Sequence, residues 1–165
     1  ATNAASARAV RWFATMQCQT GGLAAFDIDN DLVWLNAIPY GDLKAMIDPS
    51  SADITARVLE MQGQLSGGVG TADLSSSRLA KGLRYLIEQQ ESDGSWFGRW
   101  GVNYIYGTSG AVSALAVVEP AWAAAGWGSA RYQRSIKRGV AWLVSCQNAD
   151  GGWGETCESY KDPRL

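Results

Sequence analysis

The fold is decided by residues 81–108, KGLRYLIEQQESDGSWFGRWGVNYIYGT. The first half of this stretch predicts a helix, because apolar residues between 79 and 87 recur at the spacing of one helix face. The second half begins with a Gly-bearing turn at 92–94 and continues into a dense cluster of aromatic residues. We expect the helix to end at Gln90, whose amide can bond free backbone groups of the turn while the Trp96 indole covers the joint.

The same unit occurs three times along the chain, at residues 8–26, 81–96 and 138–153. Each copy has a basic residue, an aromatic residue followed by a second apolar residue, then a Gln and a Gly-bearing turn. The repeat glutamines are Gln17, Gln90 and Gln147. Trp96 and Trp153 close the second and third copies, whereas Leu23 stands at this position in the first copy. We interpret these Gln and Trp side chains as structural elements of the repeat.

The repeat glutamines are 73 and 57 residues apart, which leaves room for one further helix between successive copies. The predicted helices cover 108–118 and 52–61, the latter opened by a capping box of Ser50 and Asp53. Repeated helical hairpins with weak strand signals predict an all-α fold, either a solenoid or a closed (α/α) toroid or barrel, here partial. The prolines are expected to lie between helices, as helix breakers: Pro39, Pro49, Pro120 and Pro163.

The composition fits one ordinary globular domain and argues against several classes of protein. A net charge of −2 and a pI near 5.1, without a basic run, argue against a nucleic-acid surface. Cys18, Cys146 and Cys157 have neither disulfide-scaffold nor zinc-site spacing, which favours a reducing compartment. No apolar run reaches the roughly 20 residues of a membrane span. No signal peptide opens the chain, and its start at Ala1 suggests a slice of a longer protein.

The repeats resemble a known motif, the Gln…Gly-x-Trp or QW motif of triterpene cyclases. Four segments resemble squalene–hopene cyclases in that family's own order: GGLAAFDIDN (21–30), IPYGDLKAMIDPSSADITARVLE (38–60), GSWFGRWGVNYIYGT (94–108) and QNADGGWGETCESY (147–160). The resemblance implies that residues 1–165 are the C-terminal part of one α/α-barrel domain in a two-barrel protein. It implies an enzyme that protonates squalene at a terminal double bond and cyclises it through carbocations to hopene- or hopanol-type triterpenes, with neither cofactor nor metal.

The family's proton donor is not expected in this chain. It is the middle Asp of a D-x-D-D motif upstream of the matched region, and no D-x-D-D occurs here. Residues 27–30, Asp-Ile-Asp-Asn, match a different family segment, and we interpret them as a hydrogen-bonded turn. We therefore assign no catalytic acid and expect the chain alone to be inactive. Arg57 matches a His that supports the acid in some members; it could do so as a permanent cation, or form a plain surface ion pair.

The resemblance implies five substrate-binding residues: Phe26, Tyr40, Leu43, Trp100 and Tyr106. Phe26 matches a cavity Tyr of the family, and Tyr40 and Leu43 match positions that more often hold Phe. A hydrocarbon is bound through shape and burial, and aromatic faces stabilise a growing positive charge by roughly 0.5–2 kcal/mol per contact. The chain has no His that could act as a base. We expect Trp100 and Tyr106 to share one concave side with Arg99 left solvated, although core packing would also use both rings.

Other functions stay open on the same toroid. A protein prenyltransferase β subunit would need a zinc site with a His ligand, which this chain lacks. A related polyprenyl or oxidosqualene cyclase, or a non-catalytic module that binds a hydrophobic ligand or a partner, is an alternative. The expected partners are squalene and the rest of the same polypeptide, without nucleic acid, and a homodimer is left open. By resemblance, the full-length enzyme is a peripheral, monotopic protein on the cytoplasmic side of the bacterial membrane.

Overall fold

The computed structural model describes residues 4–38, 46–65, 76–124 and 129–160 of the chain. They form the α-helices α1 (Ala4–Thr15), α2 (Ala52–Leu65), α3 (Ser76–Glu88), α4 (Asn103–Ala124) and α5 (Ser129–Ser145), and the 3-10 helices η1 (Val33–Ala37) and η3 (Cys157–Tyr160). Within these ranges, pairing outside the helices is limited to isolated bridges, so the all-α prediction is confirmed. None of the described helices is both long and apolar enough to cross a membrane.

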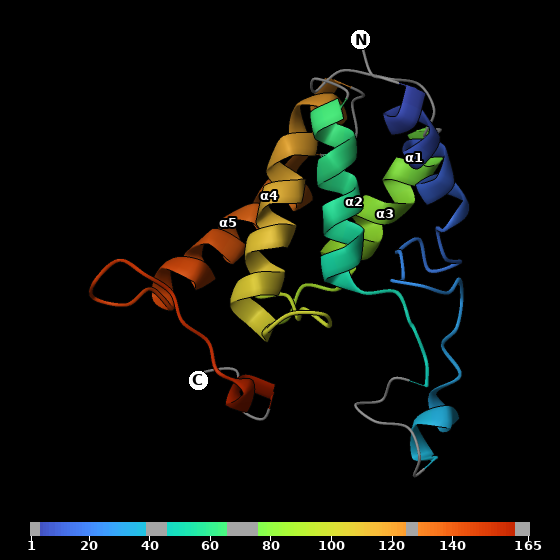
Figure 1. Cartoon of the computed structure of the whole chain (residues 1–165). Helices are drawn as coiled ribbons and strands as arrows, with labels where there is room; N and C mark the ends of the chain where they lie inside the picture. Colours follow the sequence, from blue (N-terminus) through green and yellow to red (C-terminus); the bar gives the residue numbers. More distant parts are fainter. Residues whose placement is uncertain (1–3, 39–45, 66–75, 125–128, 161–165) are drawn as a thin grey trace.

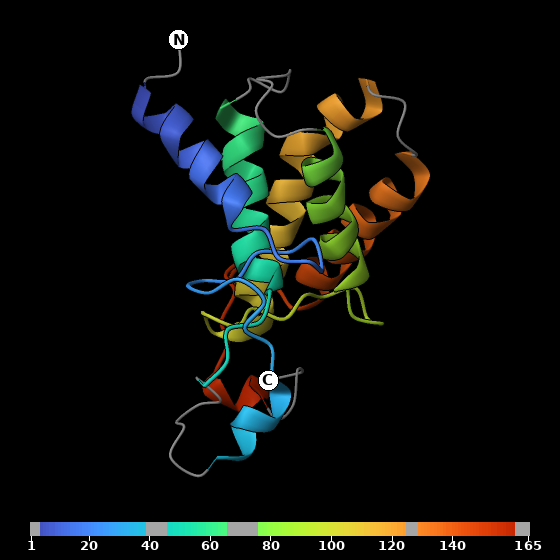
Figure 2. The ribbon, with the colours of Figure 1, turned by 90° about the vertical axis from the view of Figure 1, so that its right-hand side faces the viewer.

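The helices form two layers, and the helices of one layer run opposite to those of the other. Helices α2 and α4 lie side by side and run the same way, and α1, α3 and α5 lie behind and beside them and run the other way (Figure 1, Figure 2). The core between the layers consists of buried side chains from four helices: Leu59 of α2, Leu83 and Leu86 of α3, Leu115 of α4 and Tyr132 of α5. This arrangement is consistent with a segment of an α/α toroid, in which helical hairpins stack side by side.

Helix α4 differs from the prediction at both of its ends. It begins at Asn103 rather than at Thr108, and it continues through Pro120 to Ala124. The expectation that Pro120 lies between helices is therefore wrong. A proline removes one backbone hydrogen bond and bends a helix without necessarily ending it. Figure 2 shows the last turn of α4 bent away from the axis of the preceding turns.

Helix α2 extends beyond its predicted end, to Leu65, and its start does not use the predicted capping box. The Ser50 hydroxyl lies 2.8 Å from the Thr20 hydroxyl, and Asp53 Oδ2 accepts the Trp100 amide at 2.9 Å. The two side chains expected to cap one helix instead tie its N-terminal end to two loops that are distant in sequence.

The three repeat turns close the ends of α1, α3 and α5 in the same way. Each Gln Nε2 donates to the carbonyl of the glycine four residues later: Gln17 to Gly21 at 2.8 Å, Gln90 to Gly94 at 2.9 Å and Gln147 to Gly151 at 2.7 Å. The indoles of Trp96 and Trp153 each donate at 2.7 Å to a carbonyl ten residues earlier, in the preceding helix. The repeated spacing in the sequence thus produces a repeated joint in the structure.

Candidate functional site

Two of the predicted substrate-binding rings lie together near the N-terminal ends of α2 and α4. Phe26, from the loop after α1, and Trp100, from the loop before α4, pack edge to face with their ring centres 5.4 Å apart. Both side chains are exposed, Phe26 by 70% and Trp100 by 45%. An exposed aromatic pair of this kind offers ring faces and edges to an apolar ligand.

A buried carboxylate holds the backbone beside each of these rings. Asp48 accepts the amides of three successive residues, 25–27. Asp53, in the first turn of α2, accepts the Trp100 amide through Oδ2. The other oxygen of Asp53, Oδ1, is buried and has no hydrogen-bond partner among the described residues. The backbone under Phe26 and Trp100 is therefore anchored on the segment that leads into α2.

Arg57 lies one helical turn after Asp53 and binds the ring of Tyr106 on α4. Its Nε donates to the Tyr106 hydroxyl at 3.3 Å, and its guanidinium carbon lies 5.4 Å from the ring centre. The hydrogen bond with Tyr106, followed by the charge of that hydroxyl and smaller contributions from Asp53 and Glu60, raises the pKa of Arg57 above its ordinary value. Arg57 is exposed, so it is a permanent cation at the surface of the α2–α4 layer.

Tyr106 also links the α4 helix to the loop that carries Trp100. A Cβ added at Gly98 or at Gly101 would lie 2.5 Å from the Tyr106 ring, closer than any side chain could be accommodated. Only glycine allows the loop to pass this close to the ring. Trp100 and Tyr106 are thus held by one tightly packed turn, although each contacts a different partner.

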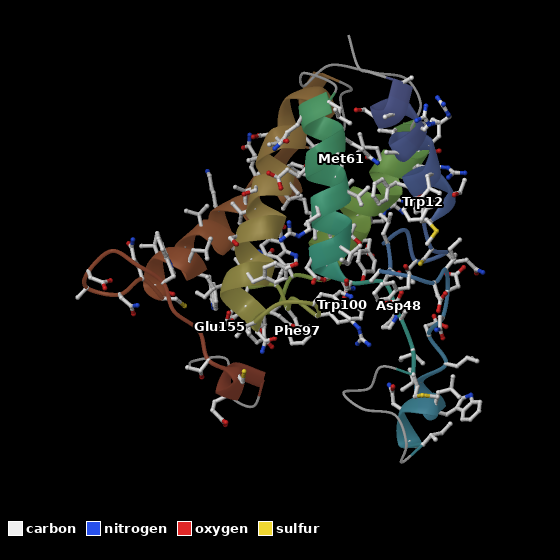
Figure 3. The ribbon with its side chains drawn as sticks, in the orientation of Figure 1. Trp12, Asp48, Met61, Phe97, Trp100 and Glu155 are labelled. Atoms are coloured by element: carbon white, nitrogen blue, oxygen red, sulfur yellow. The ribbon has the colours of Figure 1, made fainter. Side chains whose placement is uncertain are left out.

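Glu155 caps the N-terminus of α4 from the loop after the third repeat. Its two carboxylate oxygens accept the amides of Tyr104 at 2.6 Å and Ile105 at 2.9 Å. An acidic group in this position satisfies free amides and is stabilised by the helix dipole. Figure 3 shows Glu155, Phe97 and Trp100 along the same end of the helices. The third repeat therefore contributes to the position of the helix that carries Tyr106.

Helix α4 carries no charged residue between Asn103 and Val118. Its buried residues, among them Ala111, Ala114 and Leu115, face the core, whereas Ser113 and Ala116 are exposed. A helix without charges on any face is normally covered on all sides. No described part of the chain covers the face of α4 on which Ser113 and Ala116 lie.

Residues 1–165 match the family model of the squalene-hopene cyclase C-terminal domain. The chain belongs to this family. It is 49% identical to the dammaradiene synthase of Dryopteris crassirhizoma over 99% of its own length, and 44% identical to the squalene–hopene cyclase of Zymomonas mobilis over 93%. It is 41% identical to the squalene–hopene cyclase of Alicyclobacillus acidocaldarius over 92%. It spans only 24%, 21% and 31% of these three proteins.

The residues matched to the squalene–hopene cyclase family are only partly within the described structure. Tyr40 and Leu43 lie outside the described residues. Phe26 meets Trp100, and Arg57 meets Tyr106, so four candidates form two neighbouring pairs. The expectation that Arg99 stays solvated is wrong, because it is half-buried, donates to the Ile47 carbonyl at 3.0 Å and lies over the Trp100 ring.

The aspartates of the 27–30 segment both lie in a hydrogen-bonded turn. Asp29 has a positive φ of 55° and accepts the Gln19 amide at 2.8 Å, and Asp27 accepts the Asn30 side chain at 3.2 Å. No group of three or more potential metal ligands occurs among the described residues. Glu155 was not expected to bind α4, because its partner amides lie about 50 residues away in sequence. Asp48, as a single carboxylate, is expected to cap backbone amides; it does so, but with amides about 20 residues away that only the fold brings near.

Proposed function

We propose that this chain is part of the catalytic domain of a class II triterpene cyclase that converts squalene through carbocations. The observation that carries the proposal is the exposed Phe26–Trp100 pair, whose rings offer their faces to a ligand in a chain that has no histidine. Two carboxylates hold the backbone beside the pair: Asp48 accepts three backbone amides, and Asp53 accepts the Trp100 amide through one of its two oxygens. A carbocation beside these rings would gain roughly 0.5–2 kcal/mol per ring.

The rest of the site would come from the remainder of the protein. The acid that starts cyclisation is absent from the chain, and the D-x-D-D segment of the family lies upstream. The exposed guanidinium of Arg57 is suited to receive a polar group from that segment. A permanent cation close to a carboxyl group favours its ionised form and makes it a stronger acid. The uncovered, charge-free face of α4 would then form part of an apolar cavity wall.

The relatives support two kinds of product. A hopene-type product is supported by the squalene–hopene cyclases among the relatives. A dammaradiene-type product is supported by the 49% identity with the fern dammaradiene synthase. Attachment of the whole protein to a membrane through a segment outside residues 1–165 belongs to the same proposal, because the substrate is a hydrocarbon. By family resemblance, the proposal also includes that the protein comes from a bacterium and lies on the cytoplasmic side of its membrane. A homodimer is a further element of the proposal.

The test is incubation of the full-length protein with squalene, followed by gas chromatography. We expect cyclic triterpenes from the full-length protein and none from residues 1–165 alone. A matched control replaces the upstream acidic motif by Asn residues, which should abolish the product while the protein stays folded. A folded full-length protein that binds squalene without converting it would contradict the proposal and favour the non-catalytic module. Activity of residues 1–165 alone would overturn the inference that the acid lies elsewhere.

A further inference from the structure

Asp48 clamps the loop that carries Phe26 at two points. Its side chain is 95% buried, with an exposed fraction of 5%, and its carboxylate accepts the amides of Ala25 at 3.3 Å, Phe26 at 2.5 Å and Asp27 at 2.9 Å. Its own amide donates to the Asn30 carbonyl at 2.8 Å. Asp48 therefore ties both ends of the backbone segment from Ala25 to Asn30.

The Phe26 ring depends on this clamp more than a core residue would. Because the side chain is 70% exposed, burial does little to hold the ring in place. Its aromatic contact is the edge-to-face packing with Trp100. Hydrogen bonds to an ionised carboxylate are roughly twice as strong as neutral ones, and three of them converge here. The position of the ring relative to Trp100 is thus set through the backbone.

We infer that Asp48 is a positioning residue for cyclisation: it holds Phe26 against Trp100 and thereby determines where along the folded hydrocarbon positive charge is stabilised. The inference rests on the proposed function. Asp53 makes the equivalent contact for the other ring, since it accepts the Trp100 amide. The hydrogen bonds of the Asp48 carboxylate all go to backbone amides, so by this inference its effect reaches the reaction through Phe26.

The test uses Asp48→Asn in the full-length protein. Asn keeps the size of the side chain but removes its charge and turns an NH2 group toward amide donors. Hydrogen–deuterium exchange of the peptide 24–28 should speed up by at least about ten-fold, whereas the Leu23 amide, bonded to Thr55 Oγ1, stays protected. The share of partly cyclised products should rise with little change in KM, because the cation loses stabilisation while squalene binding does not.

Phe26→Leu is the companion variant, because Phe26 is exposed and its replacement should not prevent folding. It should give the same shift in products as Asp48→Asn, and the double variant should give no larger shift. If Asp48→Asn does not fold, Asp48→Glu replaces it in the test. Glu keeps the charge but moves it by one methylene group. Additive shifts in the double variant would overturn the inference, since Asp48 would then act independently of Phe26.

Asp93→Asn is the matched control. Asp93 accepts the Ser95 amide at 2.9 Å and the Trp142 indole at 3.1 Å, in the second repeat turn. Its loss should lower the melting temperature without changing the products. Equal product shifts from Asp48→Asn and Asp93→Asn would contradict the inference and indicate general loosening. If the unaltered protein forms no product from squalene, the proposed function fails, and unchanged exchange in the 24–28 peptide would still disprove the clamp.

Discussion

The second and third repeats share one local geometry and differ in burial. In both, the Gln donates to the glycine of the turn and the Trp indole donates at 2.7 Å to the preceding helix. Trp96 is nevertheless fully buried, whereas Trp153 is 46% exposed. The motif thus determines how the joint closes, and a neighbouring helix determines how much the joint contributes to stability.

The neighbour of the second repeat turn is α5. Gln90 donates a second hydrogen bond to the Ser135 carbonyl at 3.0 Å, and Arg138 donates to the carbonyls of Glu91 and Ser92 at 2.9 and 2.7 Å. A Cβ at Gly139 would lie 2.7 Å from the Trp96 ring. Among the described residues no helix stands in this relation to the third repeat turn. The following predictions test this difference in the 165-residue chain, from the largest effect to the smallest.

Trp96→Ala should lower the free energy of unfolding by about 3–5 kcal/mol, because it removes a fully buried ring and leaves a cavity. Trp153→Ala should cost only about 1–2 kcal/mol, for one hydrogen bond and a half-buried ring. Urea unfolding of both variants measures the difference. Equal losses would mean that the joint itself, and not the covering helix, provides the stability. In the full-length protein the cost of Trp153→Ala should rise if a further helix covers it.

Gly94→Ala should destabilise the chain more than Gly151→Ala. Both glycines have a positive φ, 106° and 86°, so alanine is strained by about 1–3 kcal/mol at either position. At Gly94 a Cβ would also lie 2.8 Å from the Arg138 carbonyl, whereas at Gly151 the nearest atom is 4.0 Å away. The overpacking adds about 1–3 kcal/mol at Gly94 alone. Melting curves of the two variants would contradict this if Gly151→Ala were the less stable.

Gln90→Ala should cost about 2–3 kcal/mol and Gln147→Ala about 1 kcal/mol, at about 1 kcal/mol per hydrogen bond lost. The difference reflects two further bonds between Gln90 and α5: Gln90 donates to the Ser135 carbonyl at 3.0 Å and accepts from Arg138 Nη1 at 3.4 Å. Gln17→Ala is an internal control, because Gln17 also makes a second bond, to the Arg78 carbonyl at 2.9 Å. It should resemble Gln90→Ala, and a loss as small as that of Gln147→Ala would refute the assignment.

The smallest expected effect is a loss of stability at high pH. Burial, with a smaller contribution from the Glu119 charge, raises the pKa of Tyr132, an α5 residue in the core beside the second repeat, above its ordinary value of 10.0. Since the folded-state pKa is the higher one, this stability is complete below about pH 10 and declines above it, by at most about 1.4 kcal/mol per pH unit. Tyr132→Phe should flatten the dependence of the urea midpoint between pH 9 and 11. An unchanged slope would show that other groups dominate.

Prediction from the sequence succeeded where the contacting residues are close together in the chain. A Gln bonds a glycine four residues later and a Trp bonds a carbonyl ten residues earlier, so the spacing of these residues already contains the joint. The helical hairpins and the family were also predicted from segments whose residues are close together in the chain. Prediction failed at Pro120, where propensity favoured a helix end but α4 continues to Ala124.

The candidate site could be predicted as a set of residues but not as an arrangement. The all-α class, the repeated joints and the aromatic composition of the site follow from the order of the residues. Their arrangement comes from the folded chain, in which Phe26 meets Trp100, Arg57 meets Tyr106, and Asp48 and Glu155 anchor distant backbone amides. A carboxylate can satisfy any free amide it reaches, so its sequence position carries no information about its partner. The fold selects that partner by bringing segments far apart in the chain within hydrogen-bond distance.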